Sequence, residues 1–230
     1  MVTHLQYKLF MLDWFDFLRV CLLCGVYEPP TDILCHNCWE KYKIMSGRQK
    51  SRRSLYYDFP VARAWVWNQD NHKYIKKLIY DLKGGHSVAV YQKLSLILLQ
   101  KITFSYYQDK TIIFIPAPGL KAKKNHALFL AKSLSDLTGC KYIDLLTVDK
   151  KNRKQKRLSR TERAKKVFGI KYKKIWSKEE QVVFVDDVIT TGATARAAYR
   201  ALGKPKNFEV WVLAEKLNFN RNQIISLKKA

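Results

Sequence analysis

The sequence predicts an α/β fold, in which a parallel sheet has helices on both faces and a small four-cysteine module precedes it. Short apolar runs alternate with helical patterns over most of the chain, and this alternation is typical of parallel sheets. The 230 residues are 47% apolar and include 11 Phe, 6 Trp and 13 Tyr, which is enough for a buried core and excludes a globally disordered chain. Four of the five cysteines fall between positions 21 and 38, which sets that segment apart.

The first half of the main domain is expected to contain two strands and two helices. Val61–Trp67 alternates as a strand does, and Asn71–Leu82 and Ser87–Gln100 have the pattern of helices. Thr111–Ile115 is an apolar run rich in β-branched residues. Pro116 stops this strand, because proline has no N–H to donate to a sheet.

The second half continues the same alternation. A helix is expected near Asn125–Leu137 and a short strand around Tyr142–Leu145. Val182–Val185 is the best candidate for a buried strand, because all of its residues are apolar. Ala193–Leu202 is expected to be the helix after it, and Phe208–Ala214 a closing strand.

Two domains are expected, an N-terminal helix with the cysteine module over residues 1–50 and the sheet domain over residues 55–230. Ser46–Ser54 is polar, basic and without periodicity, which predicts a linker. Leu5–Val20 predicts an amphipathic helix that packs on its own domain, with docking to a membrane or a partner as the alternative. The apolar stretch Leu5–Leu23 is too charged to span a membrane, and the start lacks the features of a secretory signal, so we expect a cytoplasmic protein. The interrupting charges are Lys8, Asp13, Asp16 and Arg19.

The cysteines Cys21, Cys24, Cys35 and Cys38 form two C-x2-C pairs separated by ten residues. Each pair lets one tight turn aim two thiolates at the same point, and the two turns together can form a tetrahedral Zn²⁺ site. Iron or two disulfides would use the same residues, although a reducing compartment disfavours disulfides. Four cysteines leave no open coordination position, so the zinc is expected to be structural. Cys140 has no partner in the sequence and is expected to be a buried apolar thiol.

The most informative segment begins with the apolar run Val182–Val185, which is followed by Asp186 and Asp187 and then by a turn that opens a helix. Backbone N–H groups of such a turn can bind an anion at the carboxyl edge of a sheet, helped by the helix dipole. Two acids beside an anion require something neutral or cationic between them, and ribose hydroxyls and Mg²⁺ meet that need. The pattern therefore indicates a ribose 5-phosphate that bears a pyrophosphate. The expected phosphate-binding residues are Thr190, Thr191, Gly192, Ala193 and Thr194.

A strand, two acids and T-T-G-A-T resemble the loop of type I phosphoribosyltransferases that binds 5-phosphoribosyl 1-pyrophosphate (PRPP). With the cysteine module in front, almost the full chain resembles the ComF family of competence proteins, which join a zinc finger to a type I phosphoribosyltransferase-like domain. The resemblance implies that fold, a structural Zn²⁺ and PRPP bound with Mg²⁺. Tyr80–His86 and Ile115–Pro118 resemble two further segments of the family. A further set of residues occurs in the same order as in the flexible-loop pattern of the family. These residues are Arg153, Gln155, Leu158, Arg163 and Phe168.

One segment departs from the family pattern. Where the family has arginine-glycine-phenylalanine-asparagine-glutamine, this chain has K-K-N-H-A over Lys123–Ala127. Charge and one amide are retained, whereas the glycine, the aromatic residue and the glutamine are absent, and this leaves turnover open. Lys123 or Lys124 is expected to contact the leaving pyrophosphate, with Asp186 and Asp187 holding the ribose during any displacement at its anomeric carbon.

The charge balance favours polyanions as partners, because 43 Lys and Arg against 19 Asp and Glu give a net charge of +24. Between Lys150 and Lys166, basic residues are opposed only by Glu162. The resemblance implies a loop that closes over PRPP there, and the alternatives are a track for single-stranded DNA or a solvated basic face. The tract has more cations than one pyrophosphate needs, so part of it is expected to serve a longer polyanion. The expected nucleic-acid contacts are Lys150, Lys151, Arg153, Lys154, Lys156, Arg157, Arg160 and Arg163.

Three functions remain open at this point. The resemblance implies a PRPP-binding protein of natural transformation, which handles incoming single-stranded DNA in the cytoplasm together with other DNA-uptake or recombination proteins. The alternatives are an active phosphoribosyltransferase that acts on an unidentified base or small nucleophile, and a PRPP-sensing interaction module without turnover. No acceptor pocket is recognisable in the sequence, so the residues do not decide among them.

Overall fold

The computed structural model describes residues 21, 35–37, 57–67, 72–84, 88–102, 107, 110–119, 125–148 and 168–216. These residues form an α/β domain around a five-stranded sheet, with a separate two-stranded sheet beside it. In chain order the elements are β1 (Val61–Trp67), α3 (His72–Gly84), α4 (Val88–Lys101), β2 (Thr111–Pro116), α5 (His126–Thr138), β3 (Lys141–Tyr142), β4 (Leu146–Val148), β5 (Phe168–Ile170), β6 (Glu180–Ile189), α7 (Ala193–Ala201) and β7 (Phe208–Lys216).

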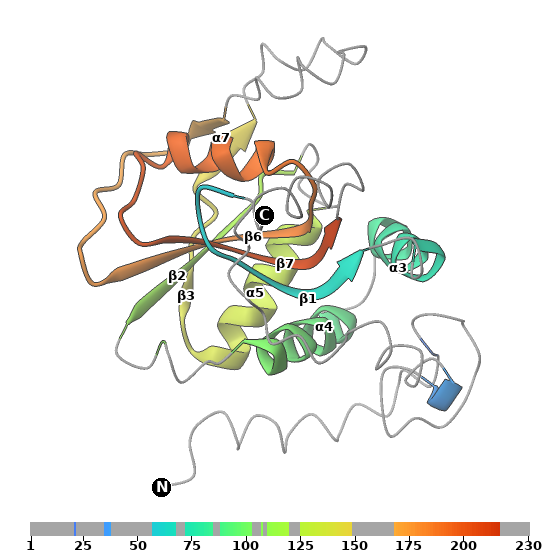
Figure 1. Ribbon diagram of the computed structural model, residues 1–230. Coiled ribbons are helices and arrows are strands. Elements are labelled where there is room, and N and C mark those ends of the chain that lie inside the picture. The colour runs from blue at the N-terminus through green and yellow to red at the C-terminus, as the bar shows by residue number, and fades with distance from the viewer. Residues whose placement is uncertain are drawn as a thin grey trace, which may run out of the picture.

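The larger sheet has the strand order β1-β7-β6-β2-β3, and each of its pairings is parallel (Figure 1). β6 lies in the centre, between β7 and β2. The carboxyl ends of parallel strands meet at one edge of the sheet, and open α/β sheets bind their ligands outside that edge. The turn that follows β6 lies there. The two strands of the smaller sheet, β4 and β5, are antiparallel.

Successive residues of β6 point into two separate cores, because side chains alternate across a strand. Val183 and Val185 belong to the core that contains residues of α4 and α5. Val182 and Phe184 belong to the core that contains residues of α7. Figure 1 shows α7 on one side of the sheet and α4 and α5 on the other. The predicted α/β fold with helices on both faces of a parallel sheet is confirmed.

The helices and the long strands expected in the sheet domain are present among the described residues, and β1 has the predicted bounds. The bounds expected for two strands need correction. The strand expected around Tyr142–Leu145 is formed only in part, since β3 spans Lys141–Tyr142 and β4 begins only at Leu146. β6 does not end at Val185 but continues to Ile189, because β7 runs beside it over that distance.

The N-terminal helix, most of the cysteine module and the linker were predicted in segments outside the described residues. Among the helices that the structure does describe, none is both long enough and apolar enough to cross a bilayer.

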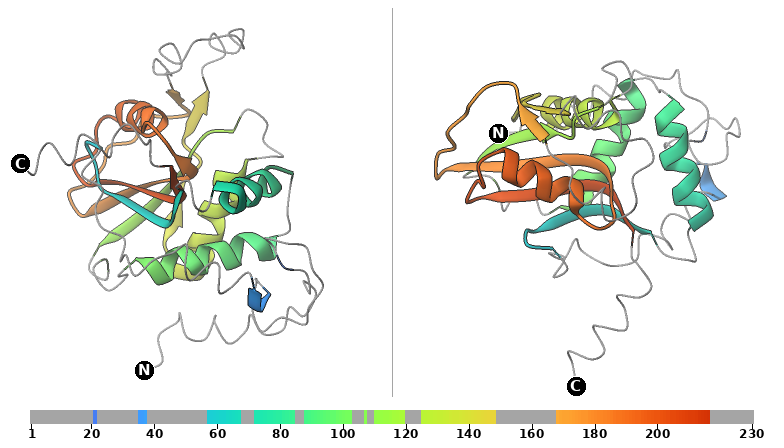
Figure 2. Two further views of the ribbon diagram at one scale, coloured as in Figure 1. Left: turned by 45° about the vertical axis from the view of Figure 1, so that its right-hand side comes forward. Right: turned by 90° about the horizontal axis from the view of Figure 1, so that it is seen from above.

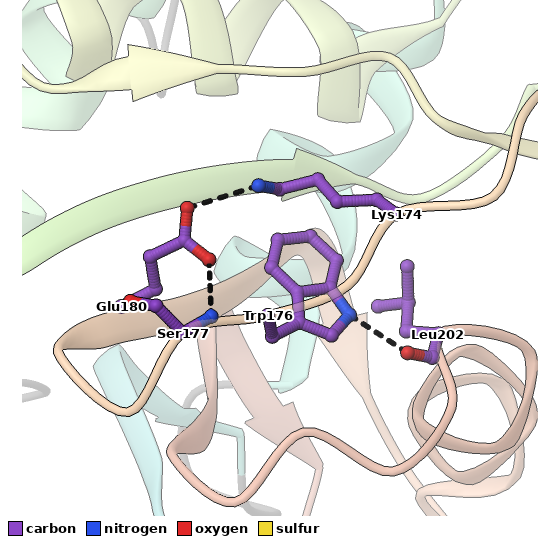
Figure 3. A network of polar contacts seen from close by, with 5 residues as sticks. All are labelled: Lys174, Trp176, Ser177, Glu180 and Leu202. Carbon is purple, nitrogen blue, oxygen red and sulfur yellow. Dashed lines mark hydrogen bonds and ion pairs between the residues drawn. The ribbon is translucent and has the colours of Figure 1, made fainter.

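The segment between β5 and β6 is tied to the C-terminal end of α7 (Figure 3). Trp176 Nε1 donates to the carbonyl oxygen of Leu202 at 2.7 Å. Lys174 Nζ lies 4.7 Å from the centre of the Trp176 ring and 2.9 Å from Glu180 Oε1. Glu180 Oε2 accepts the backbone N–H of Ser177 at 2.8 Å. These contacts fix the end of α7 relative to β6, and so help to orient the turn at the other end of the helix.

Candidate functional site

The turn between β6 and α7 requires glycine at position 192. Gly192 is the N-cap residue of α7 and has φ +73° and ψ +7°, in the left-handed region. A Cβ atom at this position would lie 2.7 Å from Cδ1 and 3.0 Å from Cε1 of Tyr57. The backbone conformation and the close approach of Tyr57 therefore both disfavour a larger residue.

Tyr57 lies in the segment before β1 and holds the turn from outside. Its hydroxyl donates to the backbone carbonyl of Thr190 at 2.9 Å. Its ring is nearly parallel to that of Phe59, with 6.0 Å between the ring centres. The turn is thus stabilised by a residue 133 positions away in the sequence.

Arg196, on the first turns of α7, places a positive charge beside the same turn. Its Nη2 donates to the carbonyl oxygen of Thr191 at 2.5 Å, and its Nη1 lies 3.3 Å from the position of a Cβ at Gly192. The backbone N–H of Arg196 donates to the Gly192 carbonyl at 2.8 Å, which begins the helix. The guanidinium and the positive end of the helix dipole act together, and this is the environment that an anion prefers.

A small pocket of about 40 Å³ opens at the turn, and Asp186 and all of the residues Thr190–Thr194 line it. A cavity of about 10–15 Å³ holds one water molecule, so the pocket has room for one small polar group. Gly192 is buried, whereas the other four turn residues are exposed or half-buried. The N–H of Ala193 points at Thr191 Oγ1 over 3.4 Å, a long contact that a stronger acceptor can replace. The turn is therefore open to a ligand.

Asp186 and Asp187 lie inside β6 rather than after it, which corrects the expectation from the sequence. As neighbours in a strand they face opposite sides of the sheet. Asp186 lines the pocket on the α7 side. Asp187 lies toward α4, which carries Tyr91. The pKa of Tyr91 is raised, mainly because the side chain is buried and in addition because the negative charge of Asp187 is near. Each carboxylate accepts the next backbone N–H, that of Asp187 at 2.9 Å and that of Val188 at 2.7 Å. Of the two acids expected to hold ribose, only Asp186 is among the lining residues of this pocket.

Two of the four predicted zinc ligands are described. Cys21 and Cys35 come from different C-x2-C pairs, both are buried, and both belong to the core that also contains residues of α3 and α4. The zinc site itself stays a prediction. Cys24 and Cys38 lie outside the described residues. Cys140 is half-buried against the same core, so the fully buried thiol that the sequence predicted is only partly confirmed.

The remaining predicted contacts all lie outside the described residues, and their roles stay predictions. These are the pyrophosphate contacts Lys123 and Lys124 and the nucleic-acid contacts Lys150, Lys151, Arg153, Lys154, Lys156, Arg157, Arg160 and Arg163.

Sequence reasoning missed Tyr57 and Arg196 as parts of the site. Arg196 had a local signal, because it follows the N-cap glycine by four positions and so lies one helical turn above it. Tyr57 had none, since only the pairing of β1 with β7 brings its segment near the end of β6.

Comparison with known proteins adds no assignment to this geometry. The chain matches no protein-family model, and a search of curated proteins finds no significant match.

Proposed function

We propose that this protein binds PRPP with Mg²⁺ at the turn Thr190–Thr194 and handles single-stranded DNA, in the manner of the ComF competence proteins that the sequence resembles. The observation that carries the proposal is the pocket at the carboxyl edge of the sheet, in which Asp186 and the N-terminus of α7 lie side by side. A carboxylate next to a positive helix end suits a ligand with both hydroxyl and phosphate groups.

In this proposal the backbone N–H groups of the turn and the threonine hydroxyls bind the 5-phosphate, and Asp186 accepts hydrogen bonds from the ribose hydroxyls. Arg196 holds the Thr191 carbonyl by a hydrogen bond and so keeps its oxygen turned away from the phosphate. That oxygen would otherwise repel the negatively charged phosphate oxygens. Mg²⁺ would be held by carboxylate and phosphate oxygens, and it would neutralise charge on the pyrophosphate. The cysteine module would hold Zn²⁺ through Cys21, Cys24, Cys35 and Cys38 and would thereby order the N-terminal segment.

Calorimetry with PRPP and Mg²⁺ tests the PRPP site. Asp186→Asn removes a charged acceptor, which is worth about 1.5–3 kcal/mol, so binding should weaken roughly tenfold to a hundredfold. Asp187→Asn on the opposite face should weaken binding less, and Glu179→Gln, an exposed residue at the other edge of the sheet, should leave it unchanged. Wild-type protein that does not bind PRPP, or an equal loss in all three variants, contradicts the proposal.

Turnover is decided by a separate measurement on the same samples. Release of pyrophosphate from PRPP only in the presence of a particular base or amine would assign a phosphoribosyltransferase. Binding without release would assign a PRPP-dependent binding protein. The DNA function is tested by titration with a single-stranded oligonucleotide at two salt concentrations, because phosphate contacts make affinity depend steeply on salt.

A further inference from the structure

One face of α3 carries a basic and aromatic surface that the site at β6 does not use. The opposite face of the helix is committed to the core, since its apolar residues are at most 4% exposed. Those buried residues are Ile75, Leu78, Ile79 and Leu82. The outward side chains that the structure describes follow the i, i+3, i+4, i+7 spacing of one helical face. They are Lys73, Lys76, Lys77 and Tyr80, which we call the α3 outer face.

These four side chains line a wide, open groove. The Tyr80 side chain is 66% exposed, the most of any described tyrosine. The lining is mostly apolar, which the aliphatic stems of the lysines and the tyrosine ring account for. An exposed ring on the same face as three lysines offers a stacking surface and phosphate contacts in one place.

We propose that the α3 outer face is a binding surface for single-stranded nucleic acid. Lysine ammonium groups neutralise phosphates, and the Tyr80 ring stacks on a base, which is the combination found in sequence-tolerant single-strand binding. Duplex bases are already stacked on one another, so the exposed ring favours a single strand. The inference extends the DNA part of the proposed function and rests on it for the class of polyanion, but it uses neither the PRPP site nor the tract at 150–163.

The surface does not suit a membrane. A helix that lies in a bilayer interface inserts a broad apolar face, and the apolar face of α3 is already buried in the core. A single tyrosine is the only large apolar side chain described on the outer face.

α3 lies at the same edge of the sheet as the turn Thr190–Thr194. α3 follows the carboxyl end of β1, the same sheet edge at which β6 leads into the turn (Figure 1). The right-hand view of Figure 2 shows α3 at the periphery, beyond α4.

Fluorescence anisotropy of the full-length protein with a labelled 20-nucleotide oligo-dT tests the proposal across a salt series. In the triple variant Lys73→Ala/Lys76→Ala/Lys77→Ala the slope of log affinity against log salt should fall by about 2, since each single-strand phosphate contact contributes about 0.7. Tyr80→Ala should weaken binding roughly fivefold to a hundredfold, from about 1–3 kcal/mol per stacked base, while Tyr80→Phe keeps the wild-type affinity.

The matched control is Lys173→Ala/Lys178→Ala/Lys206→Ala, which removes three exposed lysines near the opposite edge of the sheet. Equal loss of affinity in the control and in the α3 triple variant would show an effect of net charge alone and overturn the proposal. So would Tyr80→Ala with unchanged affinity, or binding of anionic vesicles but not of oligo-dT that depends on these lysines. PRPP calorimetry on the same α3 variants should match wild type. Failure of the wild-type protein to bind PRPP would refute the proposed PRPP site, but it would not bear on the proposal for the α3 outer face.

Discussion

Substitution of Gly192 by alanine tests whether the turn is as tightly built as its geometry indicates. An L-residue in the left-handed region costs about 1–2 kcal/mol. The added Cβ would also lie 2.7 Å from the ring of Tyr57, so the ring must move and its hydrogen bond to Thr190, worth about 1 kcal/mol, is lost. We therefore expect Gly192→Ala to destabilise the fold by roughly 2–3 kcal/mol.

Gly203→Ala is the matched control, because Gly203 has φ +78° but nothing within 4 Å of its Cβ position. Gly203→Ala carries the conformational cost alone. Urea unfolding should therefore show that Gly192→Ala lowers the free energy of unfolding by about 1 kcal/mol more than Gly203→Ala does. In a Tyr57→Ala background this difference should disappear, since the clashing ring is gone. Equal destabilisation by the two glycine substitutions in the wild-type background would refute the close packing of Tyr57 on the turn.

Three further outcomes are expected. Arg196→Met keeps the aliphatic stem but removes the donor to the Thr191 carbonyl, so calorimetry should show roughly tenfold weaker PRPP binding and urea unfolding a loss of about 1 kcal/mol in stability. Burial alone would raise the pKa of Glu180, but the hydrogen bonds it accepts, first from Lys174, outweigh burial and lower the pKa below its ordinary 4.5. Its stabilising contribution is therefore complete above pH 4.5 and lost as the pH falls through the lowered pKa, so urea unfolding of Glu180→Gln should depend less on pH below 4.5. Metal analysis should find one zinc per chain in wild type and none in Cys35→Ser, and a chelator should lower the wild-type melting temperature.

Much of the fold could be predicted from local patterns. The helices and the long strands follow from hydrophobic periodicity, which depends only on neighbouring residues. The turn between β6 and α7 was predicted in the same way, since a glycine between threonines and a helix is a local signal. The cysteine pairs likewise carry their spacing in the sequence itself.

Tertiary structure decided how these pieces act together. β6 runs through Asp186 and Asp187 because β7 supplies a hydrogen-bonding partner as far as Ile189, and pairing with a distant strand leaves no signal in the local sequence. That extension places the two carboxylates on opposite faces, so their adjacency in the sequence does not make them neighbours in the pocket. The bond from Tyr57 to the turn joins segments 133 residues apart, and only the order of the strands creates it. Local propensity thus determined the elements of this protein, and the pairing of distant strands determined which of its polar side chains share a site.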